Sequence, residues 1–487
     1  MNHFFQQTKR LLVVIIFSLS MQNITANNLN ITGSSVSGSN ITFNISWENS
    51  WNVNTAPNNW DAVWVIVKYQ DCTTREWAHA NLSTLSTDHT AGSPLQVDAV
   101  SDGKGVFIRR SAVGGGNISN TSVTLKMNIT AGTYNYKVLG IEMANVPSGS
   151  FYAGDGNANA YSFVQRLITS TDQSNGFSLN FNYSGTSYYP VTSSYPTGVN
   201  SFYCMKYELS QQQYVDFLNS LTLTQQINRT AADPNSASGT YALVGTNRNG
   251  IAIMTSSNGL NPAVYGCNLN SGNAFNSSDD GQNIACNFLN SDDITAYLDW
   301  AALRPMSELE FEKICRGTLA PITGECPWGN TTLTAVNPAN LVNSGTSSEG
   351  FNNTATGLCN YNNVMTGPVR VGYAATGSTG RGSAGATYYG VLDMGGNVNE
   401  LTIHITTNQS YLGSYNYGTT TFTGLSGDGT ISQSGNANVL NWPTGNGFCN
   451  RGGNFSQTAV LLPISYRPNT FGVSSGRTST NGGRGIR

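Results

Sequence analysis

The chain has 487 residues, of which 39% are hydrophobic and 10% aromatic, so it is long enough for two or more domains with sizeable cores. Only 10% of the residues are charged and the net charge is −3, which excludes the basic surface of a nucleic-acid-binding protein. Low charge combined with 53 glycines and many Asn, Ser and Thr residues favours an extracellular or assembled protein. The aromatic content argues against disorder.

Residues 1–26 have the pattern of a secretory signal peptide. Lys9 and Arg10 precede an apolar run from Leu11 to Met21 that is too short to span a bilayer, and Ala26 suits the end of a cleavage site. A short membrane anchor is the alternative. Because no other run reaches about 18 apolar residues, we expect a secreted or cell-surface protein without a membrane span.

Residues 27–140 are predicted to form an all-β sandwich of immunoglobulin-like or fibronectin-like architecture. Polar and apolar residues alternate over 40–47, and the run 60–69 is rich enough in Val, Ile and Trp to be a central strand. Further strands are expected at 105–109, 122–128 and 133–139, with Gly, Asn and Pro clusters between them. Short strands at this spacing are typical of sandwiches.

Residues 141–487 are predicted to form an α+β domain with few helices. Ser210 is a good N-cap for one helix, a second follows Asp292, and Ser307-Glu308-Leu309-Glu310 fits a capping box that opens a third, which ends at Gly317. Residues 330–390 and 405–450 lack periodicity and are expected to form long ordered loops. The eight cysteines permit disulfides in an exported chain, but their spacing leaves the pairing open.

Five short motifs follow one another in this second part. They are RPMSELEFE at 304–312, CPWGN at 326–330, VLDMGGNVNEL at 391–401, RGGNF at 451–455 and GIR at 485–487. In this order they resemble the formylglycine-generating enzyme family, also called the sulfatase-modifying-factor family, over residues 141–487. The resemblance implies a C-type-lectin-like α+β domain with long irregular loops.

The catalytic residues that the resemblance implies are missing. Active members of the family are copper-dependent oxidases that convert a Cys of a client sulfatase to formylglycine, using two cysteines that follow the Arg-Gly-Gly element. Counted from Arg451, these positions are Gln457 and Leu462, and no cysteine follows Cys449. Copper(I) prefers sulfur ligands, which neither side chain supplies. The enzyme question stays open, and the replaced thiols favour a pseudoenzyme without catalytic residues.

Other catalytic sites have weak support in the sequence. A related branch of the family binds non-haem iron through histidines, but His79 and His89 lie ten residues apart in the predicted sandwich, and His404 lies far away. Glu308, Glu310 and Glu312 are spaced by two, so we expect no shared helix face and no acid–base pair.

Calcium is the metal that the sequence favours, in a structural role. Hard cations prefer several oxygen ligands, and the turn at Asn397, Val398 and Glu400 offers an amide oxygen, main-chain carbonyls and a carboxylate. The resemblance implies a calcium site there and a second one at Asn340 and Leu341. The alternative at the first site is a turn held by internal hydrogen bonds.

Two classes of function follow. The first is an exported, non-catalytic binding or structural protein of the cell surface or extracellular space: an adhesin, a ligand-binding protein, or a filament or surface-layer subunit. Its partner would be an extracellular ligand, a glycan or further copies of the chain, as a homo-oligomer or filament, since function can reside in loops on a rigid scaffold. The second is a metal-dependent oxidase of the formylglycine-generating or non-haem-iron type.

Overall fold

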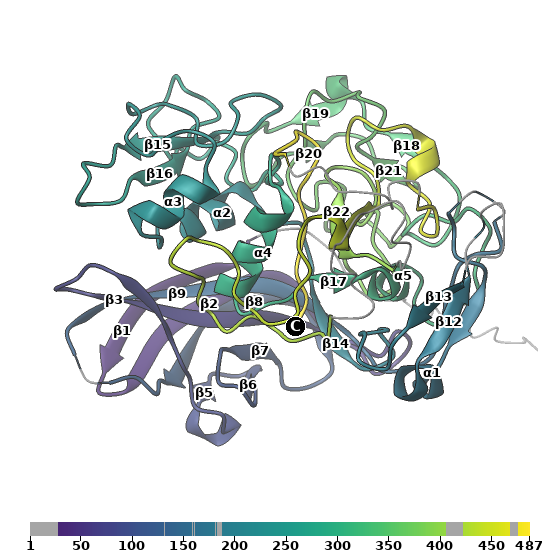
Figure 1. Cartoon of the computed structure of the whole chain (residues 1–487), viewed down its shortest axis with the longest axis horizontal. Coiled ribbons are helices and arrows are strands. Elements are labelled where there is room, and N and C mark those ends of the chain that lie inside the picture. The colour runs from purple at the N-terminus through teal and green to yellow at the C-terminus, as the bar shows by residue number, and fades with distance from the viewer. Residues whose placement is uncertain are drawn as a thin grey trace, which may run out of the picture.

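The computed structural model describes residues 28–487 except 131, 158, 160, 181, 183–187, 406–421 and 468–475. The predicted signal peptide lies outside the described residues. Within them, no helix has the length and apolar character needed to cross a membrane. The structure combines several small sheets with short helices and long connecting loops, which confirms the α+β prediction (Figure 1).

The first part of the chain forms two sheets that enclose one core. A four-stranded sheet has the order β1-β2-β8-β5, and a larger one has the order β14-β9-β3-β7-β6, with β4 paired to β3. All predicted strands of this part are present. Their bounds are β1 Asn30–Ser37, β2 Asn40–Asn52, β3 Asp61–Asp71, β4 Trp77–Ala80, β5 Thr90–Ala91, β6 Leu95–Ala99, β7 Val106–Arg110, β8 Gly114–Lys126, β9 Tyr134–Val146 and β14 Phe202–Met205.

Strand β3 is buried on both faces. Val63 and Val65 pack in the sandwich core, whereas Trp64 and Ile66 point the other way, into a core shared with helices of the second part. The Trp64 indole also donates a hydrogen bond to Ala301 O at 2.9 Å. Successive side chains of a strand point to opposite faces, so burial on both sides explains the uninterrupted apolar run.

Strand β9 connects the two parts of the chain. It pairs with β3 from Asp61↔Ala144 to Asp71↔Tyr134, runs through residue 140, and pairs with β14 on its other side. The last residues of the chain bond to β14, because Tyr203 N and Arg487 N each donate to the carbonyl of the other residue. The C-terminus therefore lies beside this sheet, as Figure 1 shows, and one sheet serves both parts.

Three helices of the described residues, α2, α4 and α5, bury apolar side chains in the cores that this sheet also lines. The helices are α1 Ser170–Asn175, α2 Gln211–Leu218, α3 Leu223–Arg229, α4 Ser291–Trp300 and α5 Glu308–Arg316, with 3-10 turns η1 Ser86–Asp88, η2 Pro338–Asn340, η3 Gly445–Gly447 and η4 Ala459–Leu461. Helices α2, α4 and α5 are the three that the sequence predicts. Each begins with a capping box, at Ser210, Asn290 and Ser307.

The remaining strands form small sheets in the second part. The two-stranded ones pair β10 Phe151–Ala153 with β11 Arg166–Ile168, β12 Phe177–Asn180 with β13 Tyr188–Val191, β15 Ile251–Thr255 with β16 Val264–Cys267, β18 Thr334–Ala335 with β21 Leu358–Cys359, and β19 Leu341–Val342 with β20 Gly350–Phe351. A three-stranded sheet has the order β17 Met306–Ser307, β22 Glu400–Ile403, β23 Phe448–Arg451. It places α5, the 391–401 motif and the Arg451 motif side by side.

Candidate functional site

Helix α5 forms the wall of the region where the sequence motifs meet. The Ser307 hydroxyl accepts from Glu310 N at 3.1 Å, and the Glu310 carboxylate accepts from Ser307 N at 2.9 Å, which completes the predicted capping box. Glu310 also binds the guanidinium of Arg304. Every residue of α5 is buried, including its three glutamates, so each carboxylate needs a charged or hydrogen-bonding partner.

Glu308 and Glu312 share one face of α5, contrary to the expectation from the sequence. They are four residues apart, and both accept from Arg451, at 2.9 Å and 3.2 Å. Neighbours spaced by two point away from each other on a helix, whereas residues four apart lie on one face. Arg467 Nε donates to Glu308 at 2.7 Å, and Arg316 pairs with Glu312 at 3.1 Å. Burial by itself raises the pKa of Glu308, but Arg467 and Arg451 outweigh it and hold that pKa well below its usual range.

The turn of the 391–401 motif is fixed by a residue that the sequence argument missed. Glu208 accepts from the Asn397 side-chain amide at 2.6 Å and from Val398 N at 3.0 Å. The Asn397 amide oxygen accepts from Val369 N at 2.8 Å. Gly396 must be a glycine, because its φ is +80° and a Cβ would lie 2.4 Å from Cys359 Sγ.

Glu400 pairs with an arginine near the C-terminus. Arg484 Nε donates to Glu400 Oε1 at 2.6 Å, and the Arg484 guanidinium also donates to the carbonyls of Met205 and Lys206. Glu400 Oε2 is buried without a hydrogen-bond partner among the described residues. Burial raises the pKa of Glu400, which Arg484 opposes.

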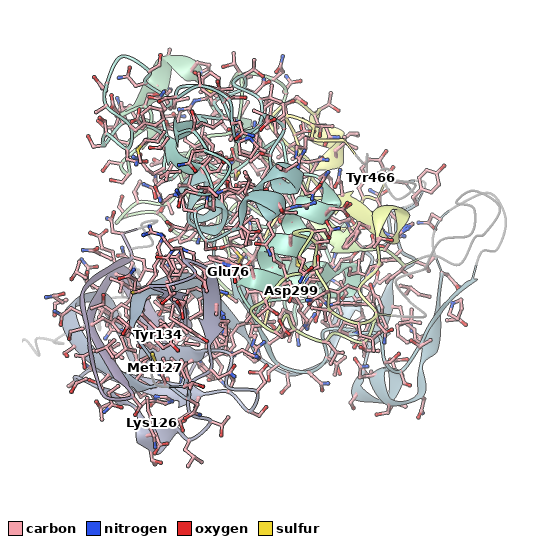
Figure 2. The ribbon with its side chains drawn as sticks, turned by 60° about the vertical axis from the view of Figure 1, so that its left-hand side comes forward. Glu76, Lys126, Met127, Tyr134, Asp299 and Tyr466 are labelled. Atoms are coloured by element: carbon pink, nitrogen blue, oxygen red, sulfur yellow. The ribbon has the colours of Figure 1, made fainter. Side chains whose placement is uncertain are left out.

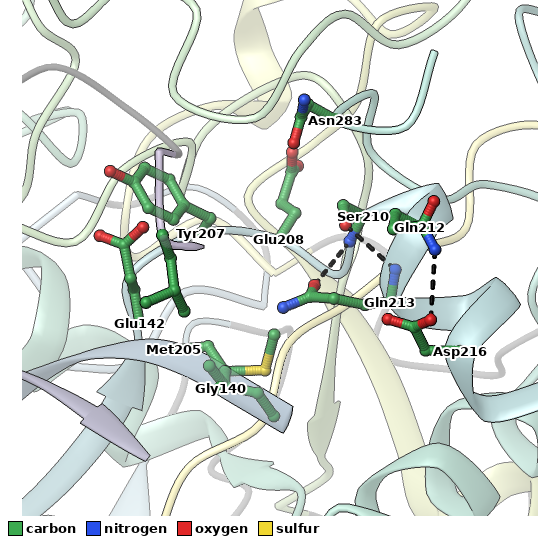
Figure 3. A pocket seen from close by; sticks show the side chains of 12 residues that line it. Gly140, Glu142, Met205, Tyr207, Glu208, Ser210, Gln212, Gln213, Asp216 and Asn283 are labelled. Carbon is green, nitrogen blue, oxygen red and sulfur yellow. Dashed lines mark hydrogen bonds between the residues drawn. The ribbon is translucent and has the colours of Figure 1, made fainter. Parts of the chain in front are cut away.

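A cavity of about 190 Å³ lies between β9 and the start of α2 (Figure 3). Glu142, Glu208 and Asp216 line it. Glu142 accepts from Lys206 at 3.2 Å and Asp216 pairs with Lys137 at 2.7 Å, while Glu208 holds the turn described above. Two of the three carboxylates are therefore paired with lysines of the chain, whereas Glu208 accepts from uncharged donors.

The comparison with protein families decides which fold these motifs belong to. The model of the sulfatase-modifying factor enzyme 1-like domain matches residues 137–478. The chain belongs to this family. The match begins inside β9, the strand that both parts of the chain share.

Three solved structures are similar to this chain at low identity. Treponema denticola variable protein 1 is 12% identical and covers 72% of this chain and 95% of its own, with a TM-score of 0.31. PvdO from Pseudomonas aeruginosa is 15% identical and covers 71% of this chain and 94% of its own, with a TM-score of 0.31. The Major Tropism Determinant U1 variant is 13% identical over 82% of each chain, with a TM-score of 0.23. No curated protein matches. Similarities this weak say nothing about ligand or activity.

The positions expected for the family's copper ligands do not fit a copper ion. Leu462 is fully buried and packs in one cluster with Cys326, Trp328 and Cys359. The main chain of Gln457 accepts from Asn362 N at 2.7 Å, and its side chain is a carboxamide. An alkyl group and an amide offer no soft donor.

Two thiols that are distant in the sequence lie next to Leu462 in the fold. Cys359 Sγ donates to Gly395 O at 3.1 Å, and burial raises the pKa of Cys326 to about 12. Cys326 and Cys359 precede Arg451 by 125 and 92 residues, and sequence spacing carries no information about contacts over such distances. All eight cysteines are free in the structure, and Cys72 alone is exposed.

The calcium-site residues are already engaged by the chain. At the first site, a cation beside Asn397 and Glu400 would compete with Arg484 and with the N–H donors of the turn, although the unpartnered Glu400 oxygen leaves one contact open. At the second site, the Asn340 amide donates to Asn353 at 3.1 Å, and Leu341 pairs with Phe351 between β19 and β20. Calcium stays a prediction at both.

The histidines lie on separate elements. His79 is in β4, His89 follows η1 and His404 follows β22. Burial lowers the pKa of His404 to about 4, with Glu308 acting against it. Across the residues that the structure describes, no group of three or more His, Cys, Asp or Glu side chains is arranged to hold a metal ion.

Proposed function

We propose that this chain is an exported, non-catalytic binding protein of the cell surface or extracellular space, built on the sulfatase-modifying-factor scaffold. The observation that carries the proposal is Leu462, an alkyl side chain buried against Trp328, Cys326 and Cys359 where an oxidase of this family would need a thiolate. The alkyl side chain of Leu462 has no donor atom, so it cannot bind copper(I) or support a copper-dependent oxidation.

The rest of the region supports a structural base for binding loops. Four buried arginines form ion pairs with carboxylates of the chain: Arg316, Arg451, Arg467 and Arg484. They therefore hold loops in place and do not face a substrate. Such a base carries loops that vary in sequence while the scaffold stays rigid. The low charge of the chain fits an extracellular ligand, a glycan or further copies of the chain as partner.

An oxygen electrode and metal analysis test the proposal. We expect the copper-loaded or iron-loaded protein to consume no oxygen with a cysteine-containing peptide and to form no aldehyde. Mass spectrometry of the natural protein should find the mature N-terminus just after Ala26. Turnover of the peptide, or retention of residues 1–26 on an intracellular protein, would refute it.

The oxidase remains the second candidate because of one observation. Cys326 and Cys359 lie in the same buried cluster as Leu462, so thiols are present close to the expected position. The variants Cys326→Ser and Cys359→Ser separate the two proposals. An oxidase activity that both substitutions abolish would favour this candidate, whereas the binding protein predicts that neither changes oxygen consumption.

Structural calcium at the Asn397–Glu400 turn is a further part of the proposal. The unpartnered Glu400 oxygen supports it. Added calcium should raise the melting temperature of the wild type and leave that of Glu400→Gln unchanged, because bound ligand stabilises only the state that binds it. Equal melting temperatures with calcium and with chelator would remove calcium from the proposal.

A further inference from the structure

A groove lies where the larger sheet, β14-β9-β3-β7-β6 with β4, meets the connection between helices α2 and α3. Its volume is about 500 Å³, which is within the usual range of small-molecule sites. The β3–β4 hairpin forms one wall, and residues 219–223 and 260–264 form the other. A cavity of about 90 Å³ shares Trp77, Ser220 and Leu221 with this groove and leads inward to Lys68 and His79. Glu76, labelled in Figure 2, is exposed and lines the wider groove.

The groove presents carbon surface to solvent. Trp77 is half-buried in β4, so part of its indole remains accessible. Leu260 is 91% exposed and Val264 is 39% exposed on the opposite wall. Asn258 fixes the turn that carries Leu260, because its side-chain oxygen accepts from Leu260 N at 3.1 Å and Asn261 N at 2.8 Å. The exposed apolar side chains thus stand on ordered backbone.

Amides and hydroxyls with fixed directions surround this carbon surface. The Asn219 side chain donates to Tyr265 O at 2.9 Å and accepts from Tyr265 N at 2.8 Å. The Gln70 amide donates to Arg75 O at 2.8 Å. Each amide group has two N–H bonds and two lone pairs, so both side chains keep spare donors and acceptors. The groove therefore offers neutral hydrogen-bonding groups in set directions.

The groove has no excess charge of either sign at its rim. Arg75 and Glu76 are both exposed there and cancel. At the inner end, the Lys68 ammonium donates hydrogen bonds to Trp300 O and Gly429 O, each at 2.6 Å. A small ionic ligand would gain little from such a site.

The inner end also holds a buried imidazole. His79 Nε2 lies 2.8 Å from Lys104 O, and because a carbonyl only accepts, that nitrogen carries the proton. His79 Nδ1 is buried without a hydrogen-bond partner among the described residues, and Gly429 packs against it, so the imidazole closes the inner end and leaves ligand contacts to the amides.

We propose that this groove binds a neutral saccharide, with one sugar ring against Trp77 and its hydroxyl groups on the surrounding amides. The C–H face of a pyranose is apolar and faintly positive, so it matches the negative face of an indole. Its hydroxyls both donate and accept, as the amides require. The inference rests on the proposed function, because it names the ligand of an extracellular binding protein.

An array of immobilised glycans tests the inference with the full mature chain. Neutral hexose and N-acetylhexosamine oligosaccharides form one panel, sulfated and uronic-acid glycans a second, and peptides a third. We expect binding to the neutral panel, a loss of about tenfold or more for Trp77→Ala, and a smaller loss for Leu260→Ser. Leu440→Ser is the matched control, because Leu440 is 73% exposed and lies outside the lining of the groove.

The variants distinguish failure of the inference from failure of the proposed function. Trp77→Phe guards against misfolding, since it keeps an aromatic ring and should retain most of the affinity. Glycan binding that survives Trp77→Ala and Leu260→Ser would show that the saccharide site is not this groove, and it would leave the proposed function intact. Binding of the anionic or peptide panel alone, or of none, would also overturn the inference. The proposed function is refuted separately, by oxidation of the cysteine peptide or by retention of residues 1–26 on an intracellular protein.

Discussion

Asp393 holds a carboxyl group in the buried turn that leads to Asn397 and Glu400. Burial raises the pKa of Asp393 to about 6, although Gly372 N donates to the carboxylate. The folded chain therefore binds a proton there more readily than the unfolded chain, where the pKa is 3.8. The stability from this preference is complete below pH 3.8 and is lost as the pH rises through 6.

Asp393→Asn should remove that loss, because the amide stays neutral and still accepts from Gly372 N. Relative to wild type, the variant should gain about 2 kcal/mol in unfolding free energy between pH 4 and pH 7, since a shift of about two pKa units is worth about 3 kcal/mol in all and part of it has already titrated at pH 4. Urea unfolding at the two pH values measures this. Asp292→Asn, at an exposed position of α4, controls for the chemical change. A difference that does not vary with pH would contradict the account.

Helix α5 shows how one element binds distant loops into a rigid base. Glu308 neutralises both Arg451 and Arg467, and none of the three is more than 2% exposed. Glu308→Gln leaves two buried guanidinium groups short of a counter-charge. Breaking a buried pair typically costs about 3–5 kcal/mol, so we expect a loss of that size in unfolding free energy at pH 7. Glu76→Gln on the surface is the control, and a loss below about 1 kcal/mol would refute this role for Glu308.

The sequence predicts elements better than it predicts their partners. Ser307 and Gly317 mark the two ends of α5 through capping chemistry that acts over a few residues. Glu308 meets Arg451 and Arg467 only after 143 and 159 residues, and Asn397 meets Glu208 across 189 residues. Tertiary packing sets these contacts, and periodicity carries no information about them. The groove at Trp77 could not be predicted from the sequence for the same reason, since three separate segments form it.

At the scale of the whole molecule, the shared sheet decides how the chain unfolds. Strand β9 pairs with β3 along eleven residue pairs and with β14 along four, so it belongs to both parts. Trp64 and Ile66 pack in the same core as helices α2 and α4. The family match from residue 137 therefore does not mark off an independent unit. A ligand in the Trp77 groove would contact residues of both parts, because residues 70 and 74–77 line one wall and residues 219–223 and 260–264 line the other.

We expect the full chain to unfold in one cooperative transition, because neither part can keep this sheet alone. In calorimetry the van't Hoff and calorimetric enthalpies should agree. A fragment of residues 27–140 would lose the end of β9 and expose Trp64, Ile66 and Phe107, which are at most 5% exposed in the full chain. This fragment should show no cooperative melting by circular dichroism. A fragment of residues 27–146 keeps all of β9 but still lacks the helices, so it should also show no cooperative melting. Two separate transitions in the full chain, or a fragment that melts sharply, would show that the first part folds without the second.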